Sequence, residues 1–567
     1  MLAPRLSCTW LLSLLLIGLV ASISAYPVCL IFLNSFILSR PGLPTTWGLE
    51  GWVGAFNDRA LLSALVNTFS LATVRIVITS ILAIFFAWVV TRTDTPFKGF
   101  LEVTLWLGFF LPLLPMTMGW ILLLDPHYGL LNKLLKRILN VSAAPFNIFS
   151  YWGIIWCHLA FSTSVRFLLM TPAFKTMDAA LEEAARTSGS NSLGTLFRIT
   201  VPILAPAILA STALGFIKSL ESFEVELVLG IPAGIYVFST RIYDFIHWDP
   251  PLYGQATALS SIFLVVIFAL IWIQRVLLRG RQYTTVSGRG YVVRPFSLGP
   301  WRWVTCAFCV LFIFVMILLP LSTLIMGTFM EVFGFFDLAS PWTIRHWATA
   351  FNDPTFLRSL TNTLVLGASA SIGGTLFYFL LSYSIVRTRI PGRGLVDILS
   401  WLPWALPGVL ISLALLWAVL GSGSVVKLLY GTTFVLILAI IIKEMPLGSQ
   451  IIKAGIMQIS KELEEASAVS GAPWFSTFCR VLVPLLKPTL MAVGLIMFIA
   501  AVREIPAVIF LSTYQSRTIS LLMLDSIAEA NLERAAVIGL FLVFLVLTLA
   551  FVACILGLRM SPGEERY

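Results

Sequence analysis

Two stretches of this sequence share one pattern: LEEAARTSG at residues 181–189 and LEEASAVSG at residues 463–471, displaced by 282 positions. Around them, residues 181–206 and 463–488 are identical at 12 of 26 positions. A single short match would be expected by chance, but agreement over this length indicates duplication. We therefore take the two stretches as matching parts of a repeated fold.

The duplication extends upstream of these stretches at a different offset. There the recurring residues are separated by 295 positions: Ala55–Asp58 and Ala350–Asp353, Asn67 and Asn362, Arg92 and Arg387, Pro96 and Pro391, Trp106 and Trp401, Pro112 and Pro407. The change from 295 to 282 means that the first half carries 13 additional residues before its copy of the motif. We place them in the loop near residues 125–149.

The composition predicts a membrane protein. Hydrophobic residues make up 59% of the 567 residues and charged residues 11%, whereas soluble domains carry about 25% charged residues. Each bilayer crossing needs about 20 mostly apolar residues. We predict an all-α integral membrane fold with about twelve spans, at 10–36, 65–91, 101–124, 150–172, 203–222, 257–278, 303–327, 360–386, 396–420, 431–452, 485–510 and 534–558.

The distribution of basic residues predicts the orientation. The segment 275–302 contains six arginines and no acidic residue, which favours the cytoplasmic side. With twelve spans both termini are then cytoplasmic, and residues 10–38 are a retained span rather than a signal peptide. The family resemblance described below implies that the membrane is a bacterial plasma (inner) membrane. Lys133, Lys136 and Arg137 would lie outside, where we expect a short amphipathic interfacial helix.

Two halves follow from the repeat. The first covers residues 1–279, with a core at about 61–278 and its motif loop at 174–201; the second covers 302–567, with a core at about 356–558 and its loop at 453–483. Residues 280–301 form a basic linker. Because each half has six spans running in the same direction, we predict two parallel six-helix repeats related by an axis along the membrane normal.

Each motif loop is predicted to be a helix, a break and a second short helix. Gly189 and Gly471 are expected to end the first helix, since glycine tolerates the left-handed conformation that follows a helix. Pro202 and Pro484 are expected at the start of the next span, because proline suits the first turn of a helix.

These loops resemble the EAA motif of the type I permeases of ATP-binding-cassette (ABC) importers, EAA…G…LP. Ser467 replaces the second alanine in the second copy, and Val201 and Val483 stand where the motif has leucine. The resemblance implies that each loop forms a coupling helix that docks on an ATP-hydrolysing subunit, with Glu183 and Glu465 contacting that subunit. The residues matched to coupling are Glu182, Glu183, Ala184, Ala185, Gly189, Glu464, Glu465, Ala466 and Gly471.

The resemblance implies a transporter subunit rather than an enzyme. No G-x-x-x-x-G-K-[ST] motif for ATP occurs in the chain, so two separate ATPase subunits are expected, together with a periplasmic or extracellular solute-binding protein. Residues 222–243 and 503–506 resemble fused permeases grouped with ferric-iron importers, so ferric iron is the expected cargo. Related permeases carry thiamine, polyamines, phosphonates or sulfate, and these remain alternatives.

Two acidic residues are candidates for the translocation path. Glu224 and Glu504 follow matching spans, and ionisable residues at membrane depth are often functional. The alternative is that both lie at the outer interface and pair with Lys218 and Arg503. For the other ionisable residues within apolar stretches, we expect interior packing or pairing between helices: Arg75, Arg166, Lys443 and Glu444.

Other function classes fit the sequence less well. A secondary transporter driven by an ion gradient would not need paired coupling loops, and a membrane enzyme would need a cluster of reactive side chains. The basic charge lies in short loops, so nucleic-acid binding is not expected. The Cys306–Cys309 pair and the four scattered histidines predict neither a metal site nor a cofactor.

Overall fold

The computed structural model describes residues 3–41, 43–278, 295–421 and 423–555. Within these ranges the chain is helical, and its β-structure is limited to three isolated bridges. Ten of the described helices are long and apolar enough to cross a membrane, and two bent pairs of helices also pass that test. The prediction of an all-α membrane fold is confirmed.

The helices of the first half are α1 (Ala3–Asn34), α2 (Glu50–Asn57), α3 (Ala60–Arg92), α4 (Lys98–Phe110), α5 (Leu113–Leu124), α6 (Leu130–Leu139), α7 (Tyr151–Thr176), α8 (Ala179–Thr187), α9 (Ser192–Thr195), η1 (Leu196–Thr200), α10 (Val201–Leu220), η2 (Glu226–Gly230), η3 (Ile231–Ala233), α11 (Phe238–His247) and α12 (Tyr253–Leu278). Most of the predicted basic linker, including Arg281, Arg289 and Arg294, lies outside the described residues.

The helices of the second half are α13 (Trp301–Ile313), η4 (Phe314–Leu318), α14 (Leu319–Gly327), α15 (Arg345–Asn352), α16 (Pro354–Arg387), α17 (Arg393–Trp401), η5 (Leu402–Ala405), α18 (Gly408–Leu420), α19 (Ser424–Lys427), α20 (Thr433–Gln458), α21 (Glu462–Val469), α22 (Trp474–Thr477), η6 (Phe478–Leu482), α23 (Val483–Arg503), α24 (Ile519–Ala528) and α25 (Leu532–Ile555). Their order repeats that of the first half.

The third predicted span of each half is not one straight helix. Residues 98–124 bend by 99° before Pro112, and residues 393–420 bend by 109° before Pro407. Proline lacks a backbone N–H and disfavours helical backbone at the residue before it. The predicted spans 101–124 and 396–420 therefore correspond to bent pairs of helices, and the repeated prolines mark the bend.

Each bent pair nevertheless carries the chain across the bundle. Arg92, the last residue of α3, donates to the carbonyl of Met177, the residue after α7, so these helices end side by side and run parallel. At the opposite end, the Ile148 N–H donates to the Leu124 carbonyl over 3.3 Å, between the end of α5 and the approach to α7. The chain between α3 and α7 must therefore traverse the bundle. Counting each bent pair as one span gives up to twelve candidate spans among the described residues.

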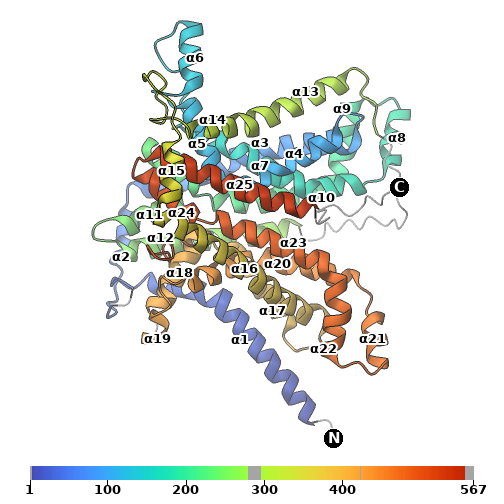
Figure 1. The fold of residues 1–567 in the computed structure, drawn as a ribbon. Coiled ribbons are helices and arrows are strands. Elements are labelled where there is room, and N and C mark those ends of the chain that lie inside the picture. The colour runs from blue at the N-terminus through green and yellow to red at the C-terminus, as the bar shows by residue number, and fades with distance from the viewer. Residues whose placement is uncertain (1–2, 42, 279–294, 422, 556–567) are drawn as a thin grey trace.

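The two motif helices lie at the same end of the molecule. Figure 1 shows α8 and α21 on one side, where α1 begins and α25 ends, and α6 and α19 towards the other. We call the first side the α8/α21 end. The loop predicted to hold the 13 additional residues contains α6, a ten-residue helix, where the second half has only the four-residue α19.

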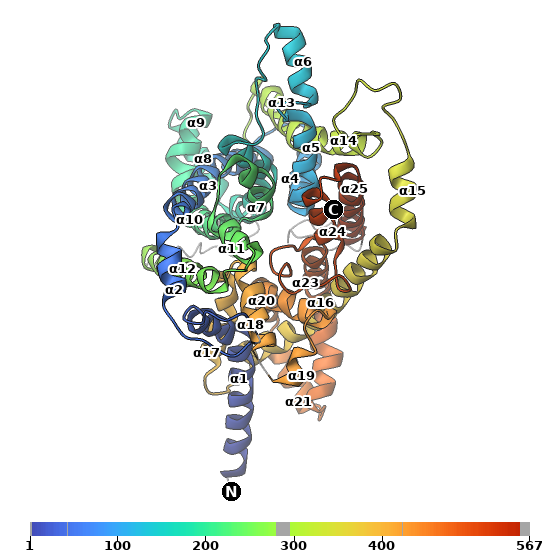
Figure 2. The same cartoon turned by 90° about the vertical axis from the view of Figure 1, so that its left-hand side faces the viewer.

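The first span of each half packs on the opposite half. Helix α1 lies against α17 and α18, and the Ser13 hydroxyl donates to the Pro391 carbonyl. Conversely, α14 crosses α5, where the Thr323 hydroxyl donates to the Gly119 carbonyl over 3.0 Å. Figure 2 shows α1 beside α17 and α18, and α14 beside α5. The predicted sequence boundary near residue 300 therefore does not separate two self-contained packing units.

Candidate functional site

The motif loops have the predicted helix–break–helix form. Gly189 has φ +89° and Gly471 has φ +80°, and each follows the end of its helix, α8 or α21. An added Cβ would meet nothing within 4 Å at either position. Glycine is thus required by the left-handed backbone, and the surrounding space is open. Pro202 and Pro484 lie in the first turns of α10 and α23, also as predicted.

The paired glutamates of each motif face different ways. The Glu182 side chain is buried at 8% exposure, and one of its oxygens accepts from the Thr200 hydroxyl over 2.7 Å. The other lies 3.6 Å from Arg92 Nη1. Its neighbour Glu183 is exposed. The first glutamate therefore anchors α8 to the bundle while the second is displayed at the surface.

The second half repeats this anchoring. Arg387 Nε lies 2.8 Å from Glu464 Oε1, and Arg387 also donates to the Ile459 carbonyl over 2.6 Å. The Tyr383 hydroxyl adds a bond of 3.4 Å to Glu464, while Glu465 is exposed.

The outer faces of the motif helices are small and accessible. Ala184 and Ala466 are exposed and Ala185 is half-buried, so a partner surface can approach the backbone closely. Sequence reasoning found these residues but missed the two arginines that hold the helices. Arg92 and Arg387 were visible as a recurring pair, but nothing local in the sequence connects them to glutamates that lie 90 and 77 residues downstream, respectively.

A second set of charged residues lies where α10 and α23 end. Both oxygens of Glu504 lie 2.7 Å from Lys443 Nζ, and Arg503 instead donates to the Phe109 carbonyl over 2.7 Å. Lys218 pairs with Glu221 at 3.0 Å. The alternative in which Glu224 and Glu504 pair with Lys218 and Arg503 is therefore wrong for both acids.

Glu224 is the unpaired acid of this group. It makes no hydrogen bond or ion pair with any of the residues described, and it lines a cavity of about 160 Å³. The cavity is lined by residues of the first half, chiefly of α7 and α10, together with Pro506 of the second half. The structure therefore separates the two predicted pathway acids: Glu504 is held by a cation, and Glu224 faces open space.

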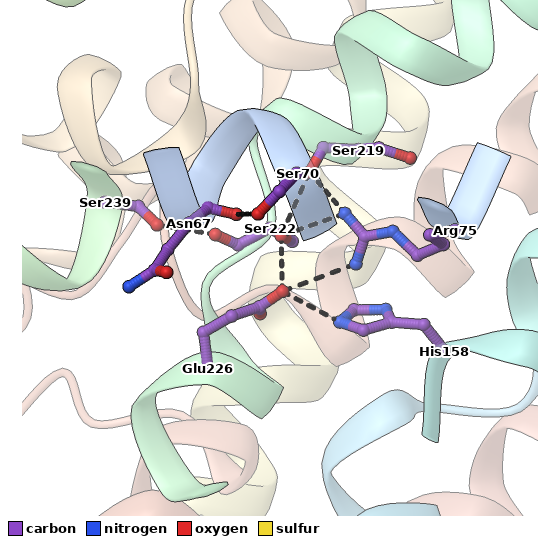
Figure 3. A network of polar contacts seen from close by, with 8 residues as sticks. All are labelled: Asn67, Ser70, Arg75, His158, Ser219, Ser222, Glu226 and Ser239. Atoms are coloured by element: carbon purple, nitrogen blue, oxygen red, sulfur yellow. Dashed lines mark hydrogen bonds and ion pairs between the residues drawn. The ribbon is translucent and has the colours of Figure 1, made fainter. Parts of the chain in front are cut away.

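A buried polar network adjoins the same cavity (Figure 3). One oxygen of Glu226 accepts from the Ser222 hydroxyl over 2.6 Å and lies 3.3 Å from Arg75 Nη1 and 3.1 Å from His158 Nε2. Arg75 donates further to the Ser219 carbonyl and the Ser222 hydroxyl. The expected pairing between helices is thus confirmed for Arg75, as it is for Lys443.

Sequence reasoning did not single out Glu226 or His158. Both lie in apolar stretches, which is the signal that could have marked them. Across the described ranges, no group of three or more His, Cys, Asp or Glu residues could hold a metal ion. Cys306 and Cys309 are buried free thiols of α13.

Comparison with known proteins places this architecture among transport proteins. Residues 387–563 match the family described as "Binding-protein-dependent transport system inner membrane component". The molybdenum transport system permease protein ModB of Escherichia coli is 30% identical over 199 residues, which cover 34% of this chain and 84% of that protein.

The chain is similar to iron permeases over longer alignments. The Fe(3+)-transport system permease protein FbpB 2 of Haemophilus influenzae is 25% identical over 95% of this chain and 97% of its own length. The ferric transport system permease protein FbpB of Actinobacillus pleuropneumoniae is 26% identical over 71% of this chain, and the alignment spans 58% of that protein. A solved bacterial alginate ABC transporter, in complex with an alginate-bound periplasmic protein, aligns with 41% of this chain and 83% of its own at 20% identity and a TM-score of 0.37.

Proposed function

Because the chain belongs to the binding-protein-dependent transport system inner membrane components, we propose that it is a membrane-spanning permease subunit of an ABC importer and that its cargo is ferric iron. The observation that carries this proposal is the alignment with an iron permease over nearly the whole of both chains. The importer would further require two separate ATPase subunits and a solute-binding protein outside the membrane. In a bacterial inner membrane, the α8/α21 end and both termini would face the cytoplasm.

The motif helices support the energy-coupling part of the proposal. Helices α8 and α21 lie at one end, and each exposes its second glutamate and a small alanine face. One ATPase subunit would dock on each helix. The buried glutamates and their arginines would then pass movement of the docked helix to α3 and α16. Arg92 and Arg387 are in this scheme positioning residues, because they act through the coupling helices and need not touch the ATPase.

The cavity supports a path for a hard cation. Carboxylate oxygens are preferred ligands of hard cations, and Glu224 offers an unpaired carboxylate to the space of this cavity. Glu504 is neutralised by Lys443, so it would shape the path rather than bind cargo directly. We therefore assign cargo contact to Glu224 and a structural role to Glu504.

An oxyanion is the second candidate cargo. It is favoured by the identity of 30% to a molybdenum permease and by a buried arginine, Arg166, that also lines the cavity. The two cargoes make opposite demands on Glu224, because removing its negative charge would weaken binding of a cation and leave binding of an anion unchanged or stronger.

Reconstituted uptake separates these proposals. The permease, with its ATPase and binding protein, would be placed in liposomes with ATP inside, and uptake of labelled ferric iron, molybdate and sulfate would be measured. Ferric uptake that needs ATP and falls in Glu224→Gln, but not in the exposed control Glu529→Gln, supports the proposal. Uptake of molybdate or sulfate alone would show that the cargo is an oxyanion rather than ferric iron. Uptake without ATP would show that the protein is not part of an ABC importer.

A further inference from the structure

The first half contains buried charges that the second half lacks. At the offsets of the repeat, three ionisable residues of α3 and α7 correspond to uncharged residues of α16 and α20: Arg75 to Ala370, His158 to Ile440 and Arg166 to Gly448. The two helix pairs pack in the same parallel way. Since α16 and α20 pack without charges at these positions, the packing of the repeated helices does not need them. Buried charge is costly within a membrane, so these three residues call for another explanation.

Arg166 is the least compensated of these residues. Its side chain is buried at 2% exposure, and its one hydrogen bond to a described residue goes to the Ser162 carbonyl of its own helix, over 2.7 Å from Nη1. Its Nε is buried without a partner. Nη2 faces Gly215, where an added Cβ would lie 2.8 Å away. A buried guanidinium group without a carboxylate is strongly unfavourable.

A second guanidinium group, that of Arg75, lines the same cavity as Arg166. Glu226 binds Arg75 and His158 through Oε1, and its Oε2 is buried without a hydrogen-bond partner. Neither oxygen forms an ion pair with Arg166. Arg75 and Arg166 both line the 160 Å³ cavity, so an anion in the cavity could approach both.

The acidic residues of the cavity form no ion pair with Arg166. Glu221 is paired with Lys218 through Oε2 at 3.0 Å, and its Oε1 is buried without a hydrogen-bond partner. Glu224 also forms no ion pair with Arg166. The guanidinium groups of Arg75 and Arg166 form one part of the cavity lining, which we call the cationic wall.

We propose that this cationic wall is a binding site for a small oxyanion, with Arg166 as the residue that contacts it. A guanidinium group offers two parallel N–H donors to a carboxylate, sulfate or phosphate, and Arg166 has Nε and Nη2 available. Arg75, held by Glu226 and Ser222, contributes a fixed second positive charge. The site is separate from coupling, and it does not depend on ferric iron being the cargo.

Thermal unfolding of the purified permease, in detergent with its ATPase subunits, tests the site. Sodium sulfate, phosphate and acetate would each be titrated, with sodium chloride at matched ionic strength as the reference. We expect a saturable rise in the unfolding temperature with at least one oxyanion, because a ligand that binds only the folded state stabilises it. A response to sulfate or phosphate alone identifies a tetrahedral anion, and a response to acetate alone identifies a carboxylate.

Variants locate the response. Arg166→Gln should abolish the saturable rise, whereas Arg198→Gln, at an exposed arginine of η1, should retain it. Gly215→Val keeps the charge but fills the space beside Nη2, so it should also abolish the rise even if Arg166→Gln fails to fold. The proposal is overturned if no oxyanion exceeds chloride, or if Gly215→Val responds like the unaltered protein. The titration needs neither ATP nor the binding protein, so its result stands whichever cargo is transported.

Discussion

Arg92, at the end of α3, contacts Glu182 of α8, and the same contact joins Arg387, at the end of α16, to Glu464 of α21. In both halves the arginine also donates to the backbone carbonyl just before the motif helix. This arrangement of an arginine, a glutamate and a backbone carbonyl occurs in both halves, although the neighbouring hydrogen bonds differ. We infer that the two arginines have the same mechanical role. Each motif helix is thereby fixed to the long helix that runs back through the bundle.

Removing this link should uncouple ATP hydrolysis from uptake. In Arg92→Gln with Arg387→Gln we expect uptake to fall about tenfold, in the range of ordinary coupling free energies, while basal ATPase activity is retained. Exchanging the charges in Arg92→Glu with Glu182→Arg should restore part of the loss in the first half. Arg345→Gln, which breaks an exposed ion pair with Glu331, should change little. Normal uptake in the double arginine variant would contradict the assigned role.

The two glycines after the motif helices should be sensitive for two separable reasons. A β-branched residue at Gly189 or Gly471 would have to adopt a left-handed backbone at a cost of about 1–2 kcal/mol, and its side chain would project into the open space where we place the ATPase. Gly189→Val and Gly471→Val should therefore abolish uptake while membrane insertion is unchanged. Gly189→Asn, which tolerates this backbone, should retain more uptake than the valine variant. Full cargo-stimulated ATPase activity in the valine variants would refute the coupling assignment.

The sequence could predict features that depend on local pattern. Apolar length located the spans, and the repeated motif located α8 and α21, because both signals lie within a few turns of chain. The bends were harder to predict from the sequence, since the residues on both sides of Pro112 and Pro407 are apolar and the hydropathy is continuous across them. A proline in an apolar stretch can kink a span without turning it by about a right angle.

Features that depend on tertiary contact could not be predicted. The packing of α1 on α17 joins residues that are hundreds of positions apart, and no local periodicity encodes it. The same holds for charge partners: Glu504 pairs with Lys443 rather than with its neighbour Arg503, because the helix directs adjacent side chains to different surroundings. The sequence could flag these residues as unusual but could not assign their partners.

The pair of Lys443 and Glu504 should matter for stability as a unit. Lys443→Met leaves a carboxylate that is buried without its cation, and loss of one partner from a buried pair costs about 3–5 kcal/mol. Lys443→Met with Glu504→Gln should recover much of that loss, because no charge is then left unpaired. Thermal unfolding in detergent measures both, with Lys487→Met at an exposed position of α23 as the control. If the double variant were as unstable as the single one, the ion pair could not be the cause.

The crossing of α5 and α14 should be intolerant of any side chain at Gly119. An added Cβ would lie 2.0 Å from the Pro320 carbonyl oxygen, which is backbone and cannot rotate away. The helices would have to separate, which would also lengthen the bond from the Thr323 hydroxyl to the Gly119 carbonyl. We expect Gly119→Ala to destabilise the protein by about 1–3 kcal/mol, as overpacking does in other cores, and to reduce uptake because α14 links the second half to the first.

The matched control for this crossing is Gly373→Ala. Its added Cβ would meet only one side-chain atom, at 3.8 Å, which is an ordinary contact, and alanine is the better helix former of the two residues. That variant should therefore unfold at or slightly above the temperature of the unaltered protein. Equal unfolding temperatures for Gly119→Ala and Gly373→Ala would contradict this prediction. They would mean that α5 and α14 leave room for a methyl group between Gly119 and the Pro320 carbonyl. The exchange of first spans between the halves would then lack its tightest point of contact.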